Sequence, residues 1–300
     1  MTKKLAKIVF FGSGPVAEES LKRLLDTFDI ECIITKNSTL NEMKNLVDTG
    51  KVFGVSNKLE LDELIKTQNF SSEIAILIDF GIIVSQTVIN KFPLGIINSH
   101  FSLLPQWRGA DPITFSLLSG QEKTGVSLMI ISSGMDEGKI LGICEETIDK
   151  KDNAKSLTNK LIRLSNKQIN AVLPLYIAGK ISAIDQVESA SLNNAPTQVT
   201  YSRKLTKQDG QIDWIKSAEV LEREIRAFIT WPKSYTKLNS TDIIIKKASV
   251  VKESGKPGKY KSDKKSLIVF CGQDALNIES IQPAGKKEMP IGAFLAGYKL

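Results

Sequence analysis

The chain has 300 residues, of which 42% are hydrophobic and 24% are charged, a composition typical of a soluble globular protein large enough for two domains. Its longest apolar runs are strand-sized, so we expect no membrane span. The N-terminus runs at once into a strand and a glycine turn, without the apolar segment of a signal peptide, and this predicts a cytoplasmic protein. Cys32, Cys144 and Cys271 lack metal-ligand spacing and argue against a disulfide framework.

Positive charge is concentrated in the last third of the chain. Residues 201–300 hold 19 Lys and Arg against 11 Asp and Glu, a net charge of +8, whereas the preceding 200 residues carry −1. A basic module of this kind favours a polyanionic partner such as nucleic acid, and a lysine-rich solvated surface explains the charge equally well. Charge alone therefore leaves both interpretations open.

The first half of the chain alternates short β-branched runs with amphipathic stretches. Strands are expected at Ala6 to Phe11, Ile30 to Thr35, Ile74 to Ile78, Gly95 to Asn98 and Thr124 to Ile131. Helices are expected at Pro15 to Asp26, Leu59 to Thr67 and Asp111 to Leu118. This alternation predicts an α/β fold with a mostly parallel, doubly wound, Rossmann-like sheet, which binds its ligands beyond the carboxyl ends of the strands.

A long helix is expected next, because apolar residues recur mainly at three- and four-residue spacing from Leu157 to Tyr176 before Gly179. The polar segment that follows (VESASLNNAPTQ) has no periodicity and is typical of a linker. We therefore expect a first domain over residues 1–186, a linker over residues 187–199 and a second domain over residues 200–300.

The second domain predicts a small, OB-like β-barrel. It has one helical stretch and several short apolar runs separated by Gly, Pro and Lys turns. These elements are Ser217 to Phe228, Ile243 to Ile245, Leu267 to Cys271 and Leu276 to Ile281. OB folds often bind nucleic acids, although a fold alone does not establish a function.

A glycine-rich turn, GSGPVA from Gly12 to Ala17, formally fits the dinucleotide-binding fingerprint. That fingerprint also requires an acidic residue for the ribose at the end of the second strand, where this chain has Thr35, Lys36 and Asn37. We therefore interpret the segment as a tight turn that places Pro15 at the first position of a helix.

His100 is the only histidine in the chain. A lone histidine is more often structural than catalytic, but this one lies just past the end of a buried strand, where α/β active sites are built. Asn98 precedes it by two residues, so on an extended backbone both side chains leave the same face. An amide donor beside an imidazole can stabilise the oxyanion that develops when an amine attacks a carbonyl. The pair predicts an acyl-type transfer.

Asp136 lies between two glycines in the segment SGMDEG, after an expected strand. A solvated aspartate in a turn explains this pattern well. If the loop folds back toward His100, the carboxylate can instead orient the imidazole and accept a proton from the attacking amine. Spacing alone does not decide between these alternatives.

Taken together, the motifs of this chain resemble those of a known family. The segment INSHFSLLPQWRGADPI is followed by TGVSLM and GMDEGKIL, and the second domain contains YSRKLTKQDGQIDW, LEREIRAF, WPKSY and IQPAGKKEM. This combination is similar to the folate-dependent formyltransferases, in particular the bacterial enzymes that formylate methionyl-tRNA. The resemblance covers nearly the whole chain.

The resemblance implies roles for three groups of residues in the first domain. Its catalytic trio is Asn98, His100 and Asp136. The folate site is lined by Ser102, Leu103, Leu104 and Pro105, and the wall of the folate pocket is formed by Asp79, Phe80, Gly81 and Ile82. The implied formyl donor is 10-formyltetrahydrofolate, and no metal is expected.

The resemblance also implies the acceptor, which is the amino group of methionine on initiator methionyl-tRNA. The second domain then binds the tRNA, which would explain the positive charge of this domain. The implied backbone contacts are Lys204, Lys207, Lys286 and Lys287. We expect a cytoplasmic monomer with no membrane partner.

Two departures from the family pattern leave alternatives open. Phe101 stands where glycine is common, and the long basic loop after the second strand is absent, with no arginine between Arg23 and Arg108. The missing loop favours a sugar-nucleotide N-formyltransferase, whereas the basic second domain counts against it. A third interpretation is an RNA-binding OB protein with an inactive first domain, which retention of the whole trio argues against.

Overall fold

The computed structural model describes residues 4–47, 51–239 and 241–298. The chain forms two compact units, which we treat separately. The first unit comprises Met1–Pro112, Lys123–Thr147 and Thr158–Ser202. The second unit comprises Ile113–Glu122, Ile148–Leu157 and Arg203–Leu300. The second unit thus includes two short segments that lie between parts of the first unit in the sequence.

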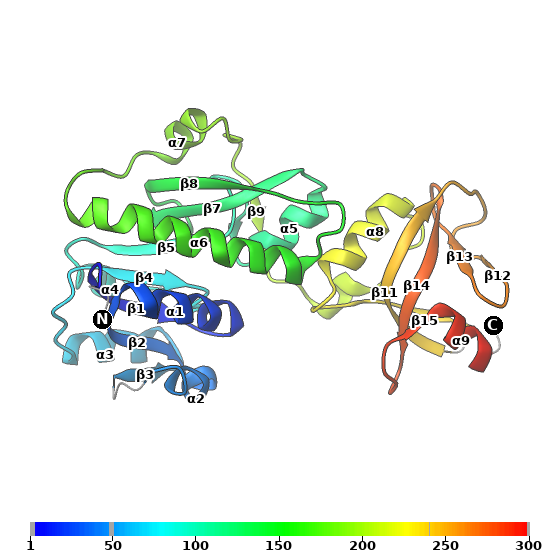
Figure 1. Ribbon diagram of the computed structural model, residues 1–300, viewed down its shortest axis with the longest axis horizontal. Helices are drawn as coiled ribbons and strands as arrows, with labels where there is room; N and C mark the ends of the chain where they lie inside the picture. The colour runs from blue at the N-terminus through cyan, green and yellow to red at the C-terminus, as the bar shows by residue number, and fades with distance from the viewer. Residues whose placement is uncertain (1–3, 48–50, 240, 299–300) are drawn as a thin grey trace. The chain divides into compact units, whose positions relative to one another are not determined.

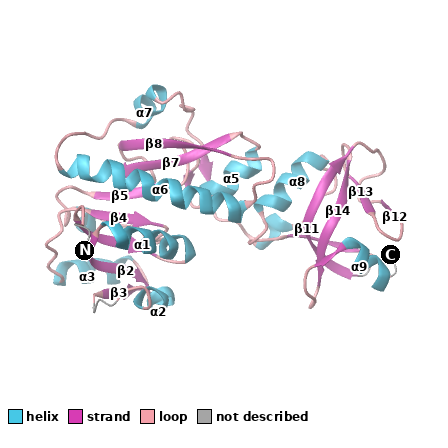
Figure 2. Cartoon of the chain, viewed as in Figure 1, coloured by secondary structure: helices cyan, strands magenta, loops and turns pink. Residues whose placement is uncertain are grey.

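The first unit is built on a seven-stranded sheet in the order β3-β2-β1-β4-β5-β7-β8 (Figures 1 and 2). Five strands are parallel, and the order reverses between β1 and β4, which is the doubly wound arrangement that the sequence predicts. At the end of the sheet, β7 pairs antiparallel with β5, and β8 pairs antiparallel with β7. The strands are β1 (Lys7–Gly12), β2 (Asp29–Lys36), β3 (Val52–Val55), β4 (Ala75–Ile78), β5 (Ile96–His100), β7 (Lys123–Ile130) and β8 (Ile140–Thr147).

Helices cover both faces of this sheet. Alternate strand residues such as Val9 and Phe11 pack with Leu61 and Ile65 of α3 in one buried cluster, while α1 and the long α6 lie over the other face, in front in Figure 1. The helices of the first 200 residues are α1 (Pro15–Thr27), α2 (Leu40–Lys44), α3 (Lys58–Thr67), α4 (Gln86–Ile89), α5 (Pro112–Ser119), α6 (Ala154–Ile177) and α7 (Gln186–Leu192), with a 3-10 turn η1 (Asn37–Thr39), and α5 belongs almost wholly to the second unit.

Local chemistry explains where these helices begin. Gly14 adopts a φ of 81°, a left-handed conformation that glycine tolerates, and Pro15 follows at the start of α1. This confirms the interpretation of the glycine turn. The side chain of Asn57 caps α3 by accepting hydrogen bonds from the backbone N–H groups of Leu59 and Glu60.

The second unit is an antiparallel sheet that curls around its own core (Figure 1). Its strand order is β10-β11-β14-β13-β12, with β15 beside β14. Leu221 and Ile225 of α8 and Phe294 of α9 pack into the core of this sheet. The elements are η2 (Lys207–Gly210), α8 (Ala218–Ala227), β10 (Ser234–Leu238), β11 (Thr241–Val251), β12 (Tyr260–Ser262), β13 (Leu267–Phe270), β14 (Ala275–Pro283), β15 (Met289–Pro290) and α9 (Ile291–Gly297).

The structure adds elements that the sequence pattern did not indicate. Strand β3 is only four residues long and contains a glycine, and β8 is an edge strand whose outer residues are partly exposed, so neither has a strong apolar signature. The segment over residues 187–199 contains most of α7. A short parallel pair joins β6 (Arg108–Gly109) to β9 (Tyr201–Ser202). No helix in the described ranges is long and apolar enough to cross a membrane.

Candidate active site

Strand β5 places Asn98 and His100 at the carboxyl end of the parallel sheet. It pairs with β4 on one side, where Asn98 lies opposite Leu77, and with β7 on the other, where His100 lies opposite Ser127. Asn98 is 9% exposed and His100 is 6% exposed, so both side chains sit at the base of the site rather than on the surface. The two-residue spacing thus gives the shared face that the sequence predicts.

The loop after β7 brings Asp136 to this pair. Its carboxylate lies 3.7 Å from His100 Nδ1 and 3.5 Å from Asn98 Nδ2. Asp136 has a φ of 52°, a left-handed conformation that aspartate adopts more readily than most residues. Gly138 permits the return of the loop, because a Cβ there would lie 1.7 Å from the carbonyl oxygen of Ile130. The folded-back alternative for Asp136 is therefore the observed one.

The segment between residues 107 and 109 completes the surroundings of the trio. The backbone N–H of Gly109 donates to Asp136 Oδ2 over 2.7 Å. His100 Nε2 lies 2.9 Å from the carbonyl oxygen of Trp107, and since a carbonyl only accepts, Nε2 carries the proton. Gly109 cannot carry a side chain, because a Cβ would lie 2.3 Å from the carbonyl oxygen of Ser202.

The arrangement combines two hydrogen-bond donors with one carboxylate in a site at the carboxyl ends of the parallel strands. Asn98 can donate to a developing oxyanion, and His100 can do so when its Nε2–H leaves the Trp107 carbonyl, while Asp136 can accept a proton. Among the described residues, no cluster of three His, Cys, Asp or Glu side chains could hold a metal ion. This geometry suits the transfer of an acyl group to an amine.

Comparison with known proteins identifies the family. The chain matches the family models "Formyl transferase" over residues 7–173 and "Formyl transferase, C-terminal domain" over residues 204–299. The chain belongs to the formyl transferase family. The resemblance seen in the sequence motifs is thus confirmed for both halves of the chain.

Relatives of this formyl transferase include curated proteins and solved structures. A methionyl-tRNA formyltransferase of Listeria monocytogenes is 30% identical over 310 residues, which cover 98% of this chain and 96% of the relative. Another, from Pseudoalteromonas translucida, is 35% identical over 241 residues, covering 79% and 73% of the two chains. The structure of WlaRD, a sugar 3N-formyl transferase with dTDP and 5-N-formyl-THF, has a TM-score of 0.67 at 19% identity and covers 95% and 100% of the two chains, a likeness of fold.

The first segment expected to line the folate site is buried against protein. Ser102 and Leu104 are fully buried and Leu103 is 2% exposed. The hydroxyl of Ser102 donates to the carbonyl of Gln106, and Ser127 Oγ accepts from the backbone N–H of Leu104. Residues 102–105 therefore offer almost no accessible surface to a folate in this structure.

The second expected folate segment follows β4 and lies at the same sheet edge as the trio. Phe80 is buried and makes an edge contact with Phe11, so its ring belongs to the core. Asp79, Gly81 and Ile82 are more accessible. The Lys36 ammonium lies over Gly81, where a Cβ would be 2.5 Å from Nζ. Asp79 is therefore the charged residue of this segment whose side chain a ligand can reach.

We expect the carboxyl of Asp79 to make the stability of the protein depend on pH. Although the residue is accessible, partial burial raises the pKa of its carboxyl to about 6, with Lys36 opposing and Asp111 adding to the shift. A raised pKa gives stability that is present below the unfolded value and is lost as pH rises through about 6. The free energy of unfolding of Asp79→Asn, relative to that of the wild type, should therefore rise by about 1 kcal/mol between pH 5 and pH 7.5. This value is reduced to allow for solvent screening of an accessible group.

Urea unfolding of both proteins at the two pH values measures this difference. Lys36→Met is the companion variant, because removal of the cation should move the transition to higher pH. A constant stability difference between Asp79→Asn and the wild type across this range would contradict the prediction.

The structure also bears on the two departures from the family pattern. After β2 the chain enters η1 and α2 directly, and the hydroxyls of Thr35 and Thr39 join the two segments over 2.8 Å. Lys36 and Lys44 are the basic residues described next to this turn. Phe101, which follows His100 in the sequence, is only 6% exposed.

The four lysines expected to contact tRNA lie on the surface of the second unit. All are exposed, and none forms an ion pair within the ranges that the structure describes. They are Lys204, Lys207, Lys286 and Lys287. Their charges are therefore available to phosphates.

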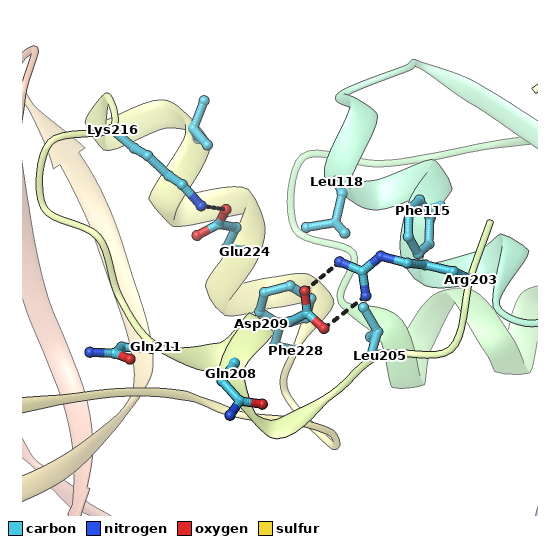
Figure 3. Close-up of a pocket in the computed structure, with 11 residues that line it drawn as sticks. Phe115, Leu118, Arg203, Leu205, Gln208, Asp209, Gln211, Lys216, Glu224 and Phe228 are labelled. Carbon is cyan, nitrogen blue, oxygen red and sulfur yellow. Dashed lines mark hydrogen bonds and ion pairs between the residues drawn. The ribbon is translucent and has the colours of Figure 1, made fainter. Parts of the chain in front are cut away.

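Two other cations of this unit are already neutralised. They border a pocket in which Arg203 donates to Asp209 over 2.9 Å and Lys216 pairs with Glu224 (Figure 3). The hydrogen bond from Arg203 holds the pKa of the Asp209 carboxyl well below its usual range. The apolar lining is made by Phe115, Leu118, Leu205, Val220 and Phe228. We do not count these two cations among the expected phosphate contacts.

Sequence reasoning missed the residues that hold the site together. Thr200 Oγ1 accepts from the backbone N–H of Trp107 over 2.9 Å, and Gln186 contacts both Arg108 and the Asp136 loop. The two residues directly flank the segment over residues 187–199 that the sequence predicts as a linker. Only the position of Arg108 within the quoted motif gave any signal of this network.

Proposed function

We propose that this formyl transferase moves the formyl group of 10-formyltetrahydrofolate to the amino group of methionine on methionyl-tRNA. The observation that carries the proposal is the convergence of Asn98, His100 and Asp136 at the end of β5. Relatives named methionyl-tRNA formyltransferase, matched over nearly the full chain, support the choice of acceptor. A neighbour solved with 5-N-formyl-THF supports the folate donor.

The proposed chemistry needs one attack and the movement of one proton in two transfers. The amine nitrogen attacks the formyl carbon, and the N–H of Asn98 and the imidazole of His100 stabilise the negative charge on the formyl oxygen. Asp136 takes a proton from the attacking nitrogen. The carbon–nitrogen bond to the folate then breaks, and the proton goes to the departing folate nitrogen.

The second unit is proposed to bind the tRNA backbone. Its net charge of +8 over residues 201–300 and its four exposed lysines suit phosphate contacts. The curled antiparallel sheet is compatible with an OB-like fold, which remains our prediction for this unit. An aminoacyl-tRNA substrate supports a cytoplasmic location.

The sugar-nucleotide alternative retains support from one observation, the short connection after β2. WlaRD, a sugar 3N-formyl transferase, also shares the fold. The basic second unit is not needed for a small acceptor, and it favours the tRNA. An RNA-binding protein without activity is disfavoured because all three members of the trio are present and adjacent.

A direct assay separates these functions. The protein is given 10-formyltetrahydrofolate with either methionyl-tRNA or an amino-sugar nucleotide, and formyl transfer is measured. We expect transfer to methionyl-tRNA. Transfer to the sugar nucleotide alone would establish the alternative acceptor, and no transfer to either with intact tRNA binding would support the inactive RNA-binding protein.

We further expect weak discrimination between methionylated initiator and elongator tRNAs. Arginine is the usual residue for reading base edges, and the short connection after β2 offers only lysines, which suit phosphates as flexible charges. Each good base contact is worth about 1 to 3 kcal/mol, or roughly 5- to 150-fold in rate. The ratio of kcat/KM for the two tRNAs at fixed salt measures this. A preference for initiator tRNA above about a thousandfold would show that another segment or tRNA deformation supplies specificity.

A further inference from the structure

We propose that Gln186 is a positioning residue that holds the loop of Asp136 in register with the segment over residues 107–109, beside the catalytic trio. The inference rests on the formyl transfer proposed above. Gln186 is the first residue of α7 and directly precedes the segment over residues 187–199 that the sequence predicts as a linker. It is only 3% exposed, so its amide is committed to protein contacts.

The amide of Gln186 contacts both sides of the site. Its Nε2 donates to the carbonyl oxygens of Asp136 over 2.7 Å and of Gly138 over 2.9 Å. Its Oε1 accepts from Arg108 Nη2 over 2.8 Å and from Arg108 Nε over 3.3 Å. One side chain therefore ties the loop that carries Asp136 to the segment that supplies the Gly109 N–H to the Asp136 carboxylate.

The position of Gln186 is itself fixed by the fold. Ile184 forms a reciprocal pair of backbone hydrogen bonds with Ile140 at the start of β8. Asp185 caps α7 by accepting from the backbone N–H of Val187. Ala190 of α7 packs on Leu103 in a buried cluster. The start of α7 is thus an ordered part of the first unit.

Loss of this tie would loosen the loop that positions the Asp136 carboxylate, leaving the Gly109 N–H and Asn98 to hold it, without removing any group of the trio. Asp136 holds a left-handed φ of 52°, which costs some energy even for aspartate, so contacts around the loop help to hold it. The pair of hydrogen bonds from Gln186 to Asp136 and Gly138 is such a constraint. A misplacement of about 1 Å at a catalytic group can lower the rate about a hundredfold.

The test compares Gln186→Met with Gln168→Met in the full-length protein. Gln168 is a matched control, because it is also a buried glutamine of this unit, and neither its Nε2 nor its Oε1 has a hydrogen-bond partner among the residues that the structure describes. For Gln186→Met we expect kcat to fall about 10- to 100-fold, with KM for both substrates within about threefold of wild type. Gln168→Met should keep wild-type kcat. Gln186→Glu keeps an acceptor for Arg108 but loses the donor to the carbonyls, so it should also lose kcat.

A second readout does not depend on activity. His100 is the only histidine in the chain, so its imidazole NMR signals are unambiguous. They should move in Gln186→Met, because the carboxylate beside Nδ1 is displaced, and stay in place in Gln168→Met. A wild-type protein that formylates no acceptor would overturn the function while the imidazole signals still test the positioning. A folded Gln186→Met with wild-type kcat and unmoved His100 signals would overturn the positioning role.

Discussion

Replacing Asn98 or His100 with alanine should lower kcat by at least about a hundredfold while the protein stays folded. The two side chains supply the donors that we assign to the developing oxyanion, and removal of one such donor typically costs this much. Both lie at the end of β5, where their loss leaves the sheet hydrogen bonds in place. Formyl transfer to methionyl-tRNA and thermal unfolding, measured on the same preparations, check the result.

Asp136→Asn should lose a similar factor, because an amide keeps the shape of the loop but cannot accept a proton. Glu137→Gln is the matched control. Glu137 is the next residue of the same loop and its side chain is 52% exposed, and Arg108 keeps its hydrogen bonds to Gln186 without it, so its neutralisation should leave kcat within about threefold. Near wild-type turnover in Asn98→Ala or His100→Ala would remove those residues from the mechanism, and an active Asp136→Asn would reduce Asp136 to a turn residue.

The second large effect is expected in the salt dependence of tRNA binding. Each lysine that binds a phosphate releases counterions, so the four lysines of the second unit should make affinity fall steeply with salt. Replacing all four with alanine should flatten the slope of log K against log salt by about 0.7 to 0.9 for each lysine that binds a phosphate in the wild type. Titration of methionyl-tRNA at several salt concentrations gives the slope. The replaced lysines are Lys204, Lys207, Lys286 and Lys287.

A control variant with the same change in net charge separates phosphate binding at these positions from the effect of bulk charge. Four other lysines of the second unit each pair with a carboxylate, so their charges are largely compensated. They are Lys237 with Asp242, Lys247 with Glu279, Lys252 with Asp274 and Lys261 with Glu253. Alanine at these four positions should change the slope much less. Equal slopes in the two quadruple variants would mean that net charge, rather than specific phosphate binding, governs affinity.

The sequence by itself determined the elements whose signal is local. Buried β-branched runs indicated four of the five parallel strands, and Gly14 with Pro15 indicated the start of α1, because these preferences depend on a few neighbouring residues. Asn98 and His100 could be paired for the same reason, since two-residue spacing on a strand fixes a shared face. The family motifs, quoted along both halves, predicted the formyl transferase assignment that the comparisons confirm.

Only the tertiary structure decided which distant residues meet. Spacing could not show that Asp136 returns to His100, because the return depends on Gly138 fitting against Ile130. Periodicity gave no sign of α7, whose Gln186 acts through long-range hydrogen bonds. The edge strand β8 was hidden because half-exposed residues dilute the apolar pattern. Local preferences fix helices and strands, whereas the return of a loop and the contacts of a polar side chain depend on packing between segments that are far apart in the sequence.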